Sequence, residues 1–131
     1  MHWTIEFDES HGYFLIVTSG DFNFTDHRKM VEDLLSQPEW RPATATLFDH
    51  RQLRFDDIGF SEVLEAKSVH VNNDAQIGNG KSAILMKSTA DYGIGRQFQN
   101  VTDGRVLAQI RIFLDEAEAI AWLVDDVPET R

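Results

Sequence analysis

The sequence contains no cysteine, which excludes disulfide bonds, thiolate chemistry and cysteine-ligated metal sites. It also lacks a long apolar run, because the longest, at 119–124, is far too short to cross a bilayer. The first residues offer neither the positive charge nor the apolar segment of a signal peptide. We therefore expect a cytoplasmic protein without stable membrane insertion.

Basic residues are scarce as well. There are 12 Lys and Arg against 22 Asp and Glu, so the formal net charge is -10. Proteins that bind nucleic acids carry a basic surface that meets the phosphates, and anionic membranes attract the same charge. The charge therefore argues against a nucleic-acid partner, and an acidic excess is typical of a protein that stays in solution.

The length and composition fit one globular domain. The chain has 131 residues, of which 42% are hydrophobic, and it shows no internal linker, repeat or low-complexity stretch. We expect a single domain at 1–124, followed by a flexible C-terminal tail at 125–131.

The C-terminal half alternates strands with helices. The expected elements are a strand at 82–86, a helix opening at 92–98, a strand at 106–113 and a helix at 115–123. The last helix starts with a capping box formed by Asp115 and Glu118. Strands that alternate with helices in this way imply parallel crossovers in an α/β domain.

The N-terminal half begins with alternating apolar and polar residues, which predict a hairpin. The expected elements are strands at 3–7 and 13–17, a helix with Thr25 as its N-cap that ends near Pro38, a strand at 44–49, a loop at 51–57 and a helix from about Ser61. The helix from Ser61 is expected to bury Leu64 together with Val63 and Ala66.

Several strands carry one apolar and one mixed face, as in 106–113, whereas doubly wound sheets bury both faces. Right-handed crossovers that always step in one direction place their helices on one side of a sheet. We therefore predict a single mixed five-stranded sheet, with an N-terminal antiparallel hairpin followed by parallel β-α units in sequential order. About four helices and a partly open sheet face complete this fold.

Two glycine-containing segments resemble cofactor motifs incompletely. The segment 75–82 ends like a phosphate-binding loop, but it has Ala75 where the first glycine belongs and it precedes a strand instead of a helix. The segment 93–98 has Phe98 in place of the third glycine of a dinucleotide fingerprint. We expect no cofactor, and we interpret the first segment as a glycine turn and the second as a helix packed closely on the sheet.

Metal and nucleophile patterns are weak. His70 and Asp74 have the spacing of metal ligands on a helix, but the position one turn earlier is Ala66, so no third ligand lines up. No segment resembles the strained turn that exposes a catalytic serine. We expect no metal site.

The best candidate site follows from position, because ligands of open α/β sheets bind beyond the C-terminal ends of the strands. The residues expected there are Asp49, His50, Arg51, Lys87, Tyr92 and Arg96. Their guanidinium groups and phenol suit a carboxylate or a phosphate. The alternative is a structural pair of Asp49 with Arg51 or Arg96, together with a helix cap at Ser88 or Thr89.

The last helix is apolar throughout 119–124, although a surface helix normally keeps a polar face. One explanation is burial under the C-terminal tail. The other is that Trp122 contacts a second subunit, which would make the protein a homodimer.

Taken together, the hairpin, the Asp49-His50-Arg51 strand end, the helix at 92–98 and the closing segment 113–123 resemble the STAS-type, SpoIIAA-like proteins of bacteria. The resemblance covers about Trp3 to Leu123. It implies a four- or five-stranded sheet with sequentially wound helices, related in fold to anti-sigma factor antagonists and to lipid-carrying CRAL-TRIO domains.

The regulatory antagonists carry a phosphorylatable serine just after the third strand. The corresponding segment here, 49–54, contains no serine or threonine, and Ser61 lies a full loop later, where it looks like a helix cap. A phosphoserine switch is therefore not expected.

The sequence favours a non-catalytic binding or regulatory domain for a small apolar or anionic molecule, or for a protein partner. A ligand site would show an apolar pocket ending at Arg51, Tyr92 and Arg96. A homodimeric interaction module without a ligand would show a flat apolar patch instead. An enzyme would place His50 or Asp49 in a cleft with a strongly shifted pKa, with Tyr92 as a further acid–base candidate.

Overall fold

The computed structural model describes residues 1–125, so 126–131 of the expected tail lie outside the described residues. The strands are β1 (His2–Asp8), β2 (Tyr13–Asp21), β3 (Ala45–Arg54), β4 (Lys81–Leu85) and β5 (Gln109–Phe113). The helices are α1 (Phe24–Leu35), α2 (Phe60–Asn72), α3 (Asp74–Ile77), α4 (Thr89–Thr102) and α5 (Glu116–Val124).

The strands form one sheet in the order β1-β2-β3-β4-β5. Strands β1 and β2 are an antiparallel hairpin, and every later pair is parallel. The mixed sheet and its sequential order confirm the fold predicted from the sequence. The described part of the chain contains five helices instead of about four, because α3 adds a single short turn before β4.

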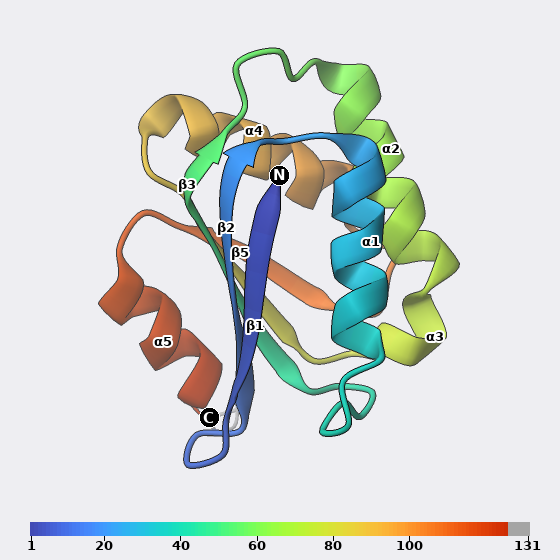
Figure 1. The fold of residues 1–131 in the computed structure, drawn as a ribbon, viewed down its shortest axis with the longest axis vertical. Coiled ribbons are helices and arrows are strands. Elements are labelled where there is room, and N and C mark those ends of the chain that lie inside the picture. Colours follow the sequence, from blue (N-terminus) through green and yellow to red (C-terminus); the bar gives the residue numbers. More distant parts are fainter. Residues whose placement is uncertain (126–131) are drawn as a thin grey trace.

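The helices divide between the two faces of the sheet (Figure 1). Helices α1, α2 and α4 cover one face, here called the helix face, while α5 lies on the other. Three crossovers that step in the same direction bring their helices to the same side. Helix α5 follows the last strand and is no crossover, so this rule does not apply to it. Helix α5 packs on the sheet face that was predicted from the sequence to be partly open.

Strand alternation gives the two faces separate cores. The helix face is built on buried side chains of Phe14, Ile16, Phe48, Ile84 and Ile112. The α5 face is built on Tyr13, Leu47, Ala83, Leu85 and Phe113, which meet Ala119 and Leu123 of α5. The apolar run at 119–124 is thus explained in part by packing within the chain.

Helix α1 begins at a different cap from the one expected. The side chain of Asn23, and not that of Thr25, accepts a hydrogen bond from the Asp26 backbone N–H at 2.8 Å. Both residue types cap helices well. With the cap at Asn23, Phe22 precedes the helix and its ring lies 5.4 Å from that of His27, a contact across the first turn that favours this entry of the chain.

Two strand boundaries and the burial of one residue also differ from the expectations. Strand β3 continues to Arg54 because β2 is long enough to pair with it as far as Asp21, so Arg51 and Arg54 belong to a strand and not to a loop. Strand β5 starts only at Gln109, since the Asp74 carboxylate accepts a hydrogen bond from the Leu107 N–H at 2.7 Å in the preceding turn. Leu64 is 40% exposed and does not join the buried stripe of α2.

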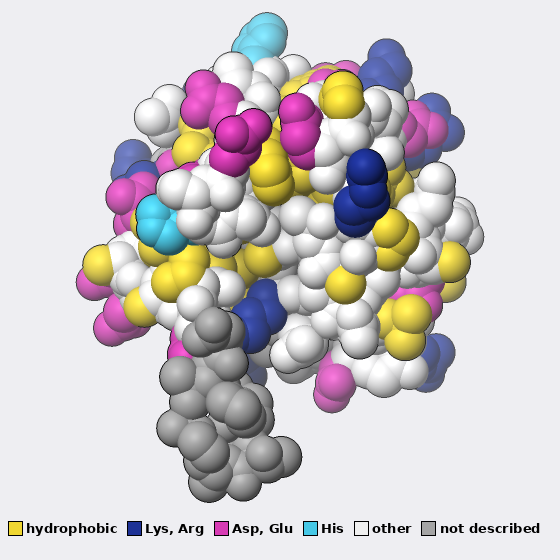
Figure 2. Space-filling view, turned by 90° about the horizontal axis from the view of Figure 1, so that it is seen from below, with side chains coloured by type: hydrophobic (Ala, Val, Ile, Leu, Met, Phe, Trp, Pro, Cys, Tyr) yellow, Lys and Arg dark blue, Asp and Glu magenta, His cyan; other side chains and the backbone are white. Residues whose placement is uncertain are grey.

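Charged side chains are dispersed over one face of the molecule. On the face seen in Figure 2, Lys and Arg side chains lie apart from one another among Asp and Glu side chains and hydrophobic patches. That face therefore has no continuous basic surface. Within residues 1–125, no helix is both long enough and apolar enough to cross a membrane.

The two glycines of α4 should respond oppositely to substitution. A Cβ atom at Gly95 would lie 2.9 Å from Ile112 Cγ2 and 3.3 Å from Met86 Cε, so Gly95→Val should destabilise the protein by about 1–3 kcal/mol through overpacking. At Gly93 a Cβ atom would meet nothing within 4 Å, so Gly93→Ala should stabilise the helix by about 0.5–1 kcal/mol. Denaturant unfolding measures both changes. A neutral Gly95→Val would contradict close packing of α4 on β5.

Candidate functional site

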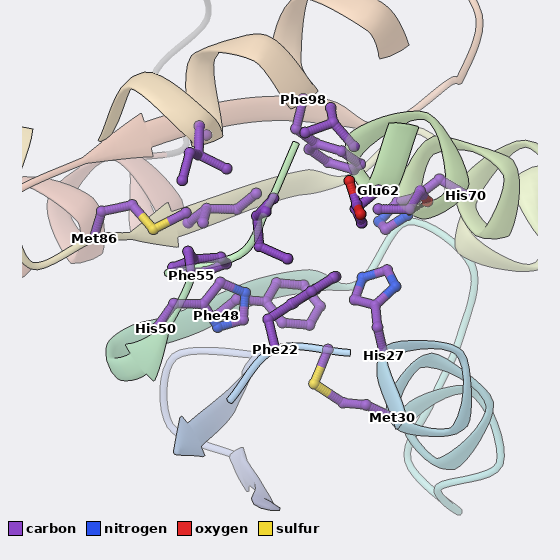
Figure 3. A pocket seen from close by; sticks show the side chains of 16 residues that line it. Phe22, His27, Met30, Phe48, His50, Phe55, Glu62, His70, Met86 and Phe98 are labelled. Atoms are coloured by element: carbon purple, nitrogen blue, oxygen red, sulfur yellow. Dashed lines mark hydrogen bonds between the residues drawn. The ribbon is translucent and has the colours of Figure 1, made fainter. Parts of the chain in front are cut away.

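A pocket lies between the helix face of the sheet and helices α1, α2 and α4 (Figure 3). It sits at the C-terminal ends of β3 and β4, the place where ligands of open α/β sheets bind. Its volume is about 60 Å³. The apolar walls are dominated by four phenylalanines and two methionines, namely Phe22, Phe48, Phe55, Phe98, Met30 and Met86.

An irregularity in the β2–β3 ladder shapes the pocket floor. The register advances from Val17↔Asp49 to Ser19↔Gln52, so β3 contains one residue more than β2 over this stretch. The extra residue changes which side chains of β3 face the helices, so odd-numbered positions after it take the place of the even-numbered positions before it. Phe48 and His50 before it, and Phe55 after it, all reach the pocket.

Three of the five histidines line this pocket, and each comes from a different element: His27 from α1, His50 from β3 and His70 from α2. The rings of His27 and His70 are nearly parallel, with centroids 6.0 Å apart. All three side chains are buried, with 7–8% of their surface exposed. An apolar pocket with convergent polar groups is the usual form of a small-molecule site.

His50 is held by Thr18. The Thr18 hydroxyl lies 2.7 Å from His50 Nδ1 and also donates to the backbone carbonyl of Asp49 at 3.1 Å. A hydroxyl has one proton, so while it donates to the carbonyl it accepts from His50 Nδ1–H. His50 Nε2 is then left with a lone pair.

His70 has a similar arrangement on α2. Its Nδ1 lies 3.4 Å from the Ala66 carbonyl oxygen, which can only accept, so Nδ1 carries the proton and Nε2 the lone pair. The ring packs edge-on against Phe98 at a centroid distance of 5.0 Å. His27, by contrast, has no hydrogen bond to any residue within 1–125, and its Nδ1 is fully buried.

Burial keeps all three imidazoles neutral at pH 7, because a low-polarity environment disfavours the charged form. It lowers the pKa of His27 to about 3, with His70 and His50 adding to the effect. Burial also lowers the pKa of His50 to about 4 against the opposing charge of Asp49. The pKa of His70 falls to about 4 for the same reason, although the Ala66 carbonyl opposes the shift.

One carboxylate, that of Glu62, borders the pocket, but it is engaged elsewhere. It accepts a hydrogen bond from the Gly59 N–H at 2.9 Å and one from the Ser61 hydroxyl at 3.0 Å, which together close the first turn of α2. The backbone N–H of Glu62 itself, followed by the Ser61 and Gly59 hydrogen bonds, lowers the pKa of the Glu62 carboxyl. No hydrogen bond joins Glu62 to the three histidines among the described residues.

The other predicted strand-end residues of β3 point away from the pocket. Neighbouring residues of a strand face opposite sides, so Asp49 and Arg51 lie on the α5 face while His50 lies on the helix face. Arg51 donates to both carboxylate oxygens of Asp49, at 3.0 and 2.9 Å, and to Glu116 at 2.8 Å. Burial tends to raise the pKa of Asp49, but the Arg51 hydrogen bonds outweigh this and lower it. The geometry matches the structural Asp49–Arg51 pair considered above and ties β3 to the start of α5.

The predicted residues that follow β4 are also separated from His50. Lys87 is exposed, and Ser88 caps α4 by accepting from the Asp91 N–H at 3.2 Å. Tyr92 and Arg96 border a broad surface groove along the outer edge of β5. The structure therefore distributes the six predicted residues over four places, and ligand binding by any of them stays a prediction.

Trp122, the predicted interface residue, packs within its own chain. Its ring lies 5.7 Å from that of Phe113, and the Lys81 ammonium lies 5.4 Å from the ring centroid. The Lys81 ammonium also donates to the Trp122 carbonyl oxygen at 2.8 Å. The side chain is half-buried, so a role between subunits stays a prediction.

Two pocket histidines were missed as site residues. His70 was considered above only as a potential metal ligand with Asp74, and His27 was not considered as a site residue. Asp74 instead caps the turn at Leu107, and no cluster of three metal-ligating side chains occurs within the described range 1–125. The sequence did contain a hint of their role, because both histidines occupy positions on the buried faces of their helices, where a polar residue is unusual.

Comparisons with known proteins support the fold. No protein-family model matches the chain, and no curated protein is similar enough in sequence to match it. Among solved structures, the chain is similar to an uncharacterised DUF3478-family protein from Shewanella loihica PV-4 that has a SpoIIAA-like fold. The two share 16% sequence identity with a TM-score of 0.60, over 93% of this chain and 92% of that one. The protein therefore has a SpoIIAA-like α/β fold, which confirms the resemblance seen in its sequence at the level of fold.

Proposed function

We propose that the protein is a non-catalytic binding domain that takes a small, mostly apolar molecule into the pocket between the sheet and helices α1, α2 and α4. The observation that carries this proposal is the pocket's lining, in which phenylalanine and methionine walls surround three buried, neutral histidines. Its place beyond the ends of β3 and β4 is a second reason, because the fold class binds ligands there.

The size of the cavity limits the ligand. A volume of about 60 Å³ accommodates about four or five water molecules or a few non-hydrogen atoms. Met30 and Met86 in the walls are unbranched and flexible, so the cavity can widen around a somewhat larger molecule. Phe22 and Ile58 are half-buried at its border, where a ligand would enter.

A regulatory role is consistent with the position of the pocket. Three helices from three successive crossovers contribute to its walls, so an occupant would contact all of them at once. A ligand that fits one packing of these helices better than another shifts the protein toward that packing.

Catalysis is less well supported. His50 lines a cleft with a strongly lowered pKa, as an enzyme would require. A general base works best with a pKa near the operating pH, however, and burial moves this one well below it. His50 is oriented by the Thr18 hydroxyl and not by a carboxylate, and the nearby Glu62 is committed to its helix cap.

Native mass spectrometry of the protein as purified from cells tests this proposal. We expect an added small-molecule mass on the wild type and its loss in Ala66→Phe, because Ala66 is a buried wall residue and the larger ring fills the cavity. Ala121→Phe, at an exposed position of α5, is the matched control and should keep the added mass. A mass that persists in Ala66→Phe would contradict binding in this pocket. The same spectra report whether the chain is a homodimer.

A further inference from the structure

The polar atoms of the pocket specify more than an apolar ligand. In His50 and His70 a hydrogen bond places the ring proton on Nδ1. A neutral imidazole carries only one N–H, so Nε2 of each ring has a free lone pair. No hydrogen bond to either Nε2 atom is present among residues 1–125, and neither atom is fully buried, so both are open to water or to a small molecule in the cavity. Both atoms can therefore accept a hydrogen bond from a molecule inside the cavity.

His27 supplies the complementary group. Its Nδ1 is completely buried without a partner, and an orphaned buried N–H is rarer in proteins than an orphaned acceptor. The proton of the neutral ring is therefore assigned to Nε2, which is the ring nitrogen that is not completely buried. His27 then offers a donor next to the acceptor of His70, whose ring is 6.0 Å away.

A charged ligand does not fit this lining. No lysine or arginine borders the pocket in the described structure, and the Glu62 carboxylate is already bonded to Gly59 and Ser61. An ion in the cavity would lose its hydration without gaining a counter-charge, which is strongly unfavourable. The occupant is therefore neutral.

We propose that the pocket recognises a small neutral aromatic alcohol of the phenol class. Its hydroxyl donates to His70 Nε2 and accepts from His27, and its ring packs among the phenylalanine side chains seen around the cavity in Figure 3. This inference rests on the proposed function and adds the chemistry of the ligand. The free cavity is smaller than a benzene ring requires, so Met30 and Met86 move aside on binding.

The test compares three ring compounds in titrations followed by NMR at pH 7.5. Phenol donates and accepts a hydrogen bond, anisole only accepts, and toluene has the same shape without a polar atom. We expect phenol to bind at least about tenfold more tightly than toluene, because a buried polar group left without its partner disfavours the wrong ligand. Anisole should bind more weakly than phenol, because it can accept from His27 but cannot donate to His70 Nε2, and the ¹⁵N resonance of His70 Nε2 should shift only with phenol.

Matched variants locate the recognition. His70→Phe keeps the ring volume and removes the acceptor, so the preference for phenol over toluene should fall several-fold, to what the His27 donor alone supplies. His2→Phe makes the same exchange at an exposed position of β1 and should leave the preference for phenol intact. If His70→Phe fails to fold, the wild-type comparison of phenol with toluene still decides the question.

The outcomes separate the two proposals. Equal affinity of the wild type for phenol and toluene, with shifts at pocket residues, would overturn the recognition of a hydroxyl and leave an apolar binding domain. Absence of any response to all three compounds would overturn the inference. The proposed function would then be tested separately, by whether native mass spectrometry finds a small molecule bound to the purified protein.

Discussion

Lowering the pH from 7 to 5 should cost the protein about 2 kcal/mol of unfolding free energy for each of its three pocket histidines. The pKa values of His27, His50 and His70 are about 3, 4 and 4 in the folded protein, against about 6.5 for an unfolded chain. The unfolded state therefore binds more protons, and stability falls as the pH drops below 6.5 and continues to fall until it reaches the folded values. The sum, about 5–6 kcal/mol at pH 5, is comparable with the whole stability of many small domains.

The histidine contribution can be separated from that of the carboxylates by its pH range. Asp8, Asp21, Asp26, Asp49 and Glu62 all have lowered pKa values in the folded protein. Their stabilising effect is present above the unfolded carboxylate values near 4 and is lost only below them. A loss of stability between pH 6.5 and pH 5 therefore belongs to the buried histidines.

Denaturant unfolding at pH 7.5, 6 and 5 measures this effect. Below pH 6, each histidine should contribute a slope of about 1.4 kcal/mol per pH unit, so His50→Phe should reduce the total slope by about one third. His2→Phe, at an exposed position, is the control and should leave the slope unchanged. A stability that stays constant from pH 7.5 to pH 5 would show that these rings are hydrated or charged in the folded protein.

The order of strands and helices was predictable because it depends on local periodicity and on one rule for crossovers. Alternation in the hairpin and the strand–helix repeats of the C-terminal half both predicted the elements that are found. The position of α5 was not predictable in this way. It follows the last strand, where no crossover rule applies, and only the packing of Ala119 and Leu123 on the sheet determines its face.

The candidate site was predicted only in its location. The rule of strand ends pointed to His50, which does lie in the pocket, but it grouped His50 with Asp49 and Arg51 although strand neighbours face opposite sides. His27 and His70 are 43 positions apart and meet only because α1 and α2 pack side by side. That contact depends on how the two helices are tilted and rotated on the sheet, which periodicity does not determine.

Gly78→Ala should be among the most damaging single substitutions in the chain, with a loss of about 3 kcal/mol or more. Gly78 has φ of 77°, and a Cβ atom there would lie 2.5 Å from the backbone nitrogen of Ala43. Left-handed strain costs about 1–3 kcal/mol, and a clash with backbone, which cannot swing away as a side chain can, adds about as much. The Ala43 N–H donates to the Ile77 carbonyl at 2.8 Å, so the two turns are also joined by a hydrogen bond.

The same contacts explain why this glycine segment only resembles a phosphate-binding loop. The Gly78 N–H donates to the Asp74 carbonyl, and the Gly80 carbonyl accepts from the Gln109 N–H, so these backbone groups are used within the fold. Gly12→Ala is the matched control for Gly78→Ala, because Gly12 has φ of 74° but nothing within 4 Å of its Cβ position. It should lose only the strain, about 1–3 kcal/mol. Equal losses for the two variants in denaturant unfolding would show that close approach of the two turns contributes nothing, and that conformation alone selects glycine at position 78.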